Sequence, residues 1–84
     1  MKQRSKELGN KNIVGFGIVK VRKSQGTKQK DLLTKLQVSG IDISATSLSQ
    51  LEGQHRYARD YEILAVAEAL DVDIKELLHR DLTD

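Results

Sequence analysis

The chain contains no cysteine and no proline, and only six of its 84 residues are glycine. Without cysteine it can form no disulfide, thiolate zinc site or cysteine nucleophile, which is typical of a protein stabilised by packing alone inside the cell. The lack of proline favours helices. The longest apolar stretches, such as residues 63–67, are far too short to span a membrane, and the basic residues 1–6 lack the apolar segment of a secretion signal. We therefore expect a cytoplasmic protein with no membrane partner.

The residues that carry catalysis are also scarce. A chain of this length builds one small domain with a single core and no deep cleft. No nucleophile with a neighbouring base, no metal-ligand set and no phosphate-binding loop is visible, and His55 and His79 lie far apart. We expect no enzyme, no metal and no cofactor. The three aromatic residues, Phe16, Tyr57 and Tyr61, are too scattered to stack the bases of single strands or RNA.

Charge is distributed unevenly, although the net charge is only +2. Residues 1–59 hold twelve Lys and Arg against four Asp and Glu, which gives +8, whereas residues 60–84 hold two against eight, which gives −6. A basic surface with an acidic rear is expected of a protein that binds a polyanion. Uneven charge is also common among small helical domains, so this pattern alone does not decide the function.

Apolar spacing predicts an all-α fold of five short helices without strands. Residues 1–12 are polar and basic, and we expect them to form a flexible basic arm before a domain over 13–79, with a short C-terminal tail over 80–84. Apolar residues then recur at helical intervals in five segments. The expected helices cover residues 14–25, 27–37, 44–53, 60–70 and 74–78.

Several residues are suited to begin or end these helices. Gly26 is expected to end the first helix, and Thr27 to cap the second. Ser44 is well placed to cap the third helix. Residues 73–76, with the sequence Asp-Ile-Lys-Glu, resemble a capping box at the start of the fifth.

The expected third helix is unusual because only Leu48 and Leu51 in it are firmly apolar. At about 100° per residue, the direction opposite these leucines points along Thr46, with Ser49 and Gln50 beside it. None of these side chains is long and charged, so this face can approach another surface closely. Such a face is typical of a helix that reads DNA.

The second and third helices with their flanks resemble the helix-turn-helix domain of phage repressors and Cro proteins, the XRE-type family. The resemblance covers roughly residues 12–78. The matching residues, in order, are Ile13, Val14, Gly15, Arg22, Gly26, Gln29, Leu32, Ile43, Ser44, Leu48, Ser49, Leu51, Glu52, Glu62, Ile63, Leu64, Ala67, Ala69 and Leu70.

The resemblance implies a compact repressor-like domain that binds double-stranded DNA sequence-specifically and regulates transcription, expected to be a repressor. Its third helix, about residues 44–52, would lie in the major groove. A homodimer would bind two half-sites about one helical turn apart. The apolar strip of Ile74, Leu77, Leu78 and Leu82 would form the dimer surface or, equally, close the core.

By position, the resemblance implies that Ala45, Thr46 and Gln50 read bases. Gln50 can pair with adenine N6 and N7, while Ala45 and the Thr46 methyl can pack on thymine methyls. Arg22 would form a structural ion pair with Glu52. The expected contacts to the DNA backbone come from Lys28, Gln29, Lys30, Ser47, Ser49, His55, Arg56 and Arg59.

The chain departs from the family pattern in three places. Lys28 replaces the usual threonine at the head of the second helix, and a glycine stands at Gly53 instead of at the position of Gln54. The usual compact turn is lengthened to residues 37–43, so the second helix runs longer or the turn bulges. The main alternative function is a protein-interaction module, antitoxin-like or an adaptor, whose partner is another protein.

Overall fold

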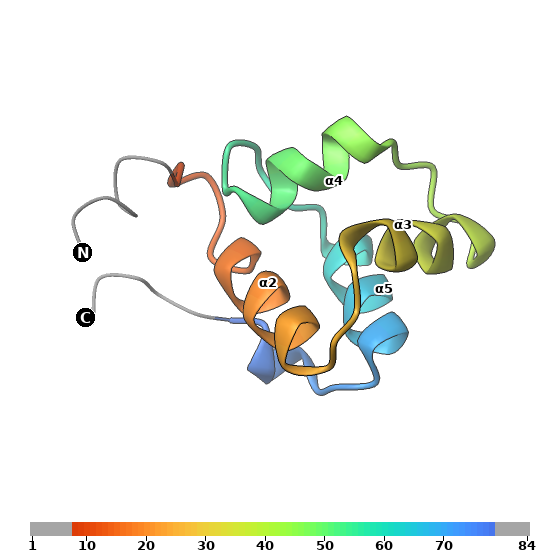
Figure 1. Ribbon diagram of the computed structural model, residues 1–84. Coiled ribbons are helices and arrows are strands. Elements are labelled where there is room, and N and C mark those ends of the chain that lie inside the picture. Colours follow the sequence, from red (N-terminus) through yellow and green to blue (C-terminus); the bar gives the residue numbers. More distant parts are fainter. Residues whose placement is uncertain (1–7, 79–84) are drawn as a thin grey trace.

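The computed structural model describes residues 8–78, and within them it contains only helices and loops (Figure 1). The predicted all-α class is confirmed. Four α-helices and one 3-10 helix follow one another as α2 (Gly15–Ser24), α3 (Gln29–Val38), α4 (Ala45–Glu52), α5 (Asp60–Leu70) and η1 (Ile74–Glu76). None of these helices is long and apolar enough to cross a membrane.

The expected fifth α-helix is a single 3-10 turn. Asp73 occupies its N-cap position, but the side chain forms no capping hydrogen bond, so the capping box is not made. Short 3-10 turns, with hydrogen bonds between residues i and i+3, are common where a segment is too short for an α-helix. The prediction of five α-helices is therefore not confirmed.

Two of the expected helix-end residues, Gly26 and Ser44, act as predicted. Gly26 and Gly40 have φ angles of 71° and 99°, which a glycine adopts readily just after α2 and α3. The Ser47 N–H donates to Ser44 Oγ at 3.1 Å and so caps α4 as predicted. Thr27 does not cap α3. The N-cap residue is Lys28, which has an extended backbone and no side-chain capping hydrogen bond, so α3 starts one residue later than predicted.

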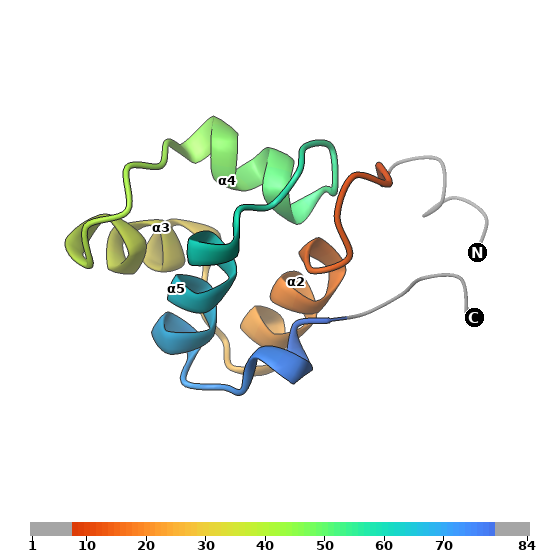
Figure 2. The same ribbon diagram turned by 180° about the vertical axis from the view of Figure 1, so that it is seen from behind.

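Helix α4 lies across one end of a bundle formed by α2, α3 and α5, and η1 lies at the opposite end (Figures 1 and 2). The core lies between these elements, because each contributes apolar residues to one cluster. The buried core residues are Val14, Ile18, Leu32, Leu36, Ile43, Leu48, Leu51, Val66, Ala67, Leu70 and Leu77. The two leucines that the sequence assigned to the inner face of α4 are both fully buried.

Leu77 belongs to this core. Its side chain is therefore not available to the C-terminal apolar strip as a surface for docking. Its side chain is fully buried, and its backbone lies so close to Gly17 that a Cβ at position 17 would collide with the Leu77 carbonyl. Ile74 is half-buried, Leu78 is 44% exposed, and Leu82 lies outside the described residues. Closing the core is thus the role of Leu77, and the strip as a whole is not a free dimer surface.

The segment just before α2 is bonded to the domain, contrary to the expected flexible arm through residue 12. The Gly9 N–H donates to the Gly53 carbonyl at 2.8 Å, and the Lys11 N–H donates to the Gln54 carbonyl at 3.0 Å. These bonds pair residues 9–11 with the loop that follows α4. Only residues 1–7 of the expected arm, together with residues 79–84, lie outside the described chain.

Asn12 joins three parts of the fold. Its Oδ1 accepts from the N–H groups of Val14 and Gly15, at 3.0 and 2.8 Å, and so satisfies donors at the start of α2. Its Nδ2 donates to the carbonyls of Leu51 and Arg56, at 3.2 and 2.8 Å. One amide therefore ties α2 to the end of α4 and to the following loop.

Replacing Asn12 by alanine is expected to destabilise the protein by about 1–3 kcal/mol, because partly buried donors and acceptors lose their partners. Urea unfolding followed by circular dichroism measures the change. Asn10→Ala is the matched control, since Asn10 is exposed, and we expect it to change stability by less than about 0.5 kcal/mol. Equal stability of the two variants would show that the Asn12 bonds do not hold the N-terminal segment.

Candidate nucleic-acid interface

The outer face of α4 is exposed and uncharged. Its exposed side chains are Ala45, Thr46, Ser49 and Gln50. In the described part of the chain, the side chains of Thr46, Ser49 and Gln50 form no hydrogen bond, so their polar atoms are free to meet a ligand. Residues four apart share a helix face, which arranges the four as two columns, Ala45 with Ser49 and Thr46 with Gln50.

The lengthened turn before α4 is anchored, so it fixes where the helix begins. Ile43 is 5% exposed and belongs to the core. The Gln37 Nε2 donates to the Ile43 carbonyl at 3.0 Å, and the Ile41 N–H donates to the Leu36 carbonyl at 3.0 Å. Helix α3 does run one residue past the predicted end, to Val38. The extra residues thus form a packed turn before Ser44.

The other end of α4 is held by a buried charge cluster around Glu52. Arg22 donates twice to this carboxylate, from Nε to Oε2 at 3.0 Å and from Nη2 to Oε1 at 2.9 Å. Gln29 Nε2 donates to Oε1 at 3.0 Å. The side chains of Arg22 and Glu52 are 12% and 5% exposed, so the ion pair that the resemblance implies is present and largely shielded from water. Gln29 braces α4 from the start of α3.

Arg22→Ala is expected to lower the free energy of unfolding by about 3–5 kcal/mol, because it leaves the Glu52 carboxylate buried without its main partner. Chemical unfolding measures this loss. Arg59→Ala is the control, since the Arg59 side chain is 65% exposed and its loss should cost less than about 1 kcal/mol. An Arg22→Ala protein with unchanged stability but lost duplex binding would contradict the structural role of Arg22.

Arg56 serves the fold instead of standing free for a DNA phosphate. Its Nε donates to the Ser47 carbonyl at 3.0 Å, and its Nη1 donates to the Tyr57 carbonyl at 2.9 Å. Nη1 and Nη2 also form a two-pronged pair with the Glu62 carboxylate, at 2.9 and 3.0 Å. Four of its five N–H donors are thereby used within the chain. The guanidinium thereby joins α4 to the start of α5, and a contact of Arg56 with the DNA backbone stays a prediction.

The Glu62 carboxylate is 3% exposed and accepts from the Arg59 backbone N–H at 3.0 Å as well as from Arg56. Burial by itself raises the pKa of Glu62. The hydrogen bonds from Arg56 and the Arg59 backbone, with the positive charges of both arginines, outweigh burial and hold this pKa below its ordinary value of 4.5. The charged form of Glu62 is therefore favoured by folding.

This lowered pKa predicts acid sensitivity. The contribution of Glu62 to stability is present above its ordinary value of 4.5 and is lost as the pH falls through the lower folded-state pKa. Urea unfolding midpoints measured between about pH 3 and pH 7 should show this fall for the wild type and a shallower one for Glu62→Gln. Glu68→Gln, at an exposed position, should keep the wild-type profile. An unaltered acid profile in Glu62→Gln would contradict the assignment.

Exposed basic side chains flank α4. Lys28 and Lys30 are exposed at the start of α3, and His55 is exposed in the loop after α4. Arg59 Nη1 lies 4.0 Å from the Glu62 carboxylate, but its side chain is 65% exposed. Among the polar residues expected at the DNA backbone, Ser47 is half-buried, Gln29 is half-buried and bonded, and Ser49 is exposed.

Two residues near this loop were missed by sequence reasoning. Lys11 Nζ lies 5.4 Å from the centre of the Tyr57 ring, which places another cation beside residues 53–59. Gln54 is 6% exposed and has a φ of 62°, where the family pattern has glycine. Its Oε1 accepts from the Phe16 N–H, and its Nε2 donates to the Gly9 carbonyl, both at 3.2 Å. The only sign in the sequence that Gln54 has a special role was that it stands where the resembled family has glycine.

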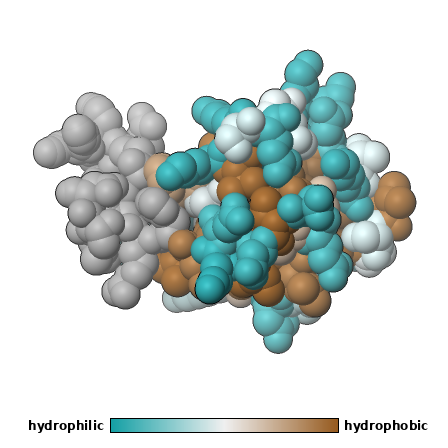
Figure 3. Space-filling model, turned by 90° about the horizontal axis from the view of Figure 1, so that it is seen from below, coloured by the Kyte–Doolittle hydropathy of each residue, from teal (hydrophilic) through white to brown (hydrophobic). Residues whose placement is uncertain are grey.

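Acidic side chains lie at the end of the molecule opposite α4. Helix α5 ends, and η1 follows, on that side in both ribbon views (Figures 1 and 2). The exposed acids of these segments are Glu68, Asp71, Asp73 and Glu76. Figure 3, seen from this end, shows apolar patches between hydrophilic side chains. Exposed Lys75 belongs to η1, and exposed Lys23 lies in the last turn of α2, whose C-cap Gln25 bonds the Leu70 carbonyl, so acids predominate at this end without being its only charges.

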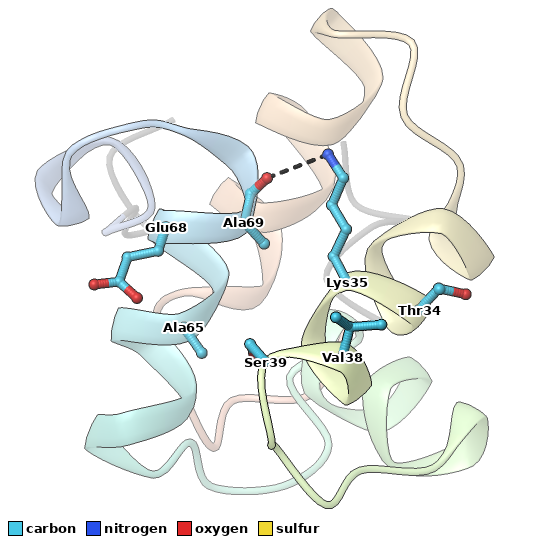
Figure 4. Close-up of a pocket in the computed structure, with 7 residues that line it drawn as sticks. All are labelled: Thr34, Lys35, Val38, Ser39, Ala65, Glu68 and Ala69. Carbon is cyan, nitrogen blue, oxygen red and sulfur yellow. Dashed lines mark hydrogen bonds between the residues drawn. The ribbon is translucent and has the colours of Figure 1, made fainter.

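A groove of about 440 Å³ lies between α3 and α5. Lys35 spans it, with Nζ at 3.4 Å from the Ala69 carbonyl, and Val38 on α3 and Ala65 on α5 are among the residues that line it (Figure 4). Val38 is 81% exposed. No group of three metal-binding side chains occurs within residues 8–78, and the groove contains no base paired with a nucleophile. Its chemistry suits an apolar contact better than catalysis.

Comparison of the chain with known protein families, with curated proteins and with solved structures finds no match. Its function therefore has to be inferred from the chemistry of its own surfaces.

Proposed function

We propose that the chain is a sequence-specific double-stranded DNA-binding protein that regulates transcription in the cytoplasm as a repressor, with α4 in the major groove. The observation that carries this proposal is the outer face of α4. Its polar side chains are exposed and unbonded within the described chain, and the helix is fixed at Ser44 and at Glu52 by capping and ion-pair contacts. A rigid helix whose outer groups are unsatisfied is prepared for contact with a polar partner.

The dimensions and electrostatics support a duplex as that partner. The major groove is about 12 Å wide and admits one α-helix. Ala45 and Ser49 are small, so the backbone of α4 can come close to the base edges. Lys28 and Lys30 stand where α3 presents its free N–H groups, a position that favours phosphate. Arg59 and His55 would contact the backbone on the other side, and the acidic end would face away.

A homodimer on DNA remains part of this proposal. A single reading helix buries little surface, and two copies on adjacent half-sites double the contact. We expect the dimer surface to exclude Leu77, because this residue is buried in the core.

Titration with random-sequence duplex at two salt concentrations tests this function. We expect micromolar or weaker binding that falls steeply as salt increases, because bound cations release counterions from phosphate. Arg59→Ala should reduce the slope of log affinity against log salt by about one. Lys75→Ala is the matched control, because Lys75 is exposed on η1, and it should keep the wild-type slope. Binding that is absent or insensitive to salt would refute the proposal.

A protein-interaction module is the second candidate. The groove between α3 and α5 favours it, because Val38, which is 81% exposed, lines the groove together with Ala65 and Ala69. In that case the uncharged face of α4 would also meet protein. The salt titration separates the two functions, since a protein-only module has no use for the cations beside α4.

A further inference from the structure

The outer face of α4 offers a narrow set of chemical groups. Ala45 contributes a methyl group, Thr46 a methyl and a hydroxyl, Ser49 a hydroxyl and Gln50 a carboxamide. The only charged residue of α4 is Glu52, which is 5% exposed and paired inward with Arg22. No cation and no anion is therefore available on the outer face of this helix.

Each base pair presents a different pattern of donors, acceptors and methyl groups in the major groove, so different side chains recognise it. Guanine is read best by Arg or Lys, and cytosine N4 is read by Asp or Glu. Adenine is read by Asn or Gln through N6 and N7, and the thymine methyl is read by apolar contact. Gln50, Ala45 and Thr46 thus supply readers for adenine and for the thymine methyl, and α4 exposes no charged reader for guanine or cytosine. The hydroxyls of Thr46 and Ser49 can bond either kind of base pair.

The spacing on α4 limits how many pairs it can read. Thr46 and Gln50 are four residues apart, or about 6 Å along the helix axis. Successive base pairs are about 3.4 Å apart. The two side chains are thus close enough together that the helix covers only a short run of neighbouring pairs.

We propose that α4 selects a half-site whose pairs beneath the helix are A·T, with Gln50 on an adenine and Ala45 and Thr46 against thymine methyls. The inference rests on the proposed DNA-binding function and adds to it the class of bases that is recognised. Lys28 and Arg59 stand outside α4, so they supply affinity through phosphates without choosing the base pair.

Selection of bound duplexes from a random library, with the full chain, tests this specificity. We expect enrichment of a short A·T run in the selected sequences. Gln50→Ala should lose preference at one adenine, by roughly five-fold to a hundred-fold, and keep the others. Gln25→Ala is the matched control, because the Gln25 side chain bonds the Leu70 carbonyl at the end of α5 and lies off α4; it should select the wild-type sequence.

Methyl removal on both sides then tests the thymine contacts. In the selected duplex, replacing each contacted thymine by deoxyuridine removes only the C5 methyl, and we expect about four-fold weaker binding per methyl. Thr46→Ser removes the protein methyl and should make binding insensitive to one of these replacements. Thr34→Ser, on the groove side of α3, should keep the full sensitivity.

The outcomes separate the two levels of the proposal. Enrichment of G·C pairs, or an unaltered adenine preference in Gln50→Ala, would overturn the A·T assignment and leave DNA binding standing. Salt-sensitive binding without any enriched sequence would overturn it too. If no duplex of the library is bound, the proposed function fails together with the inference.

Discussion

The buried carboxylate of Glu52 is the constraint on which the rest of the structure depends. A charge that is 5% exposed is stable only if its oxygens are satisfied, and here Arg22 and Gln29 supply three hydrogen bonds. Those two partners come from α2 and α3, so one carboxylate fixes three helices together. Its neighbour Leu51 fills the core from the same turn. The end of α4 therefore cannot move without breaking both the charge cluster and the apolar packing.

Charged residues near α4 divide into two groups with different roles. Arg22 and Arg56 point inward, each in a two-pronged pair with a buried glutamate, and they set the position of the helix and of the following loop. Lys28 and Arg59 are exposed and remain available to a partner. The outer face of α4 carries no charge at all. In this arrangement, ion pairs provide rigidity, exposed cations provide attraction, and small polar groups are left for recognition.

The sequence predicted the all-α class, the inward direction of Leu48 and Leu51, and the Ser44 cap, because each depends on local spacing. It could not predict the full role of Asn12, because the two carbonyls that its amide nitrogen bonds lie 39 and 44 residues away and leave no periodic pattern. The internal bonds of Arg56 were not predicted for a related reason. Its partner Glu62 is six residues on, across a loop and a helix start, and only the folded backbone brings the two together.

An NMR titration that follows each backbone amide as a short random-sequence duplex is added tests the central claim most directly. If α4 is the reading helix, the largest shifts will come from Ala45 to Gln50, with smaller ones at Lys28 and Arg59. The amides of Glu68 and Lys75 at the acidic end will stay unchanged. Shifts confined to the groove between α3 and α5, or no shifts at all, would contradict the account.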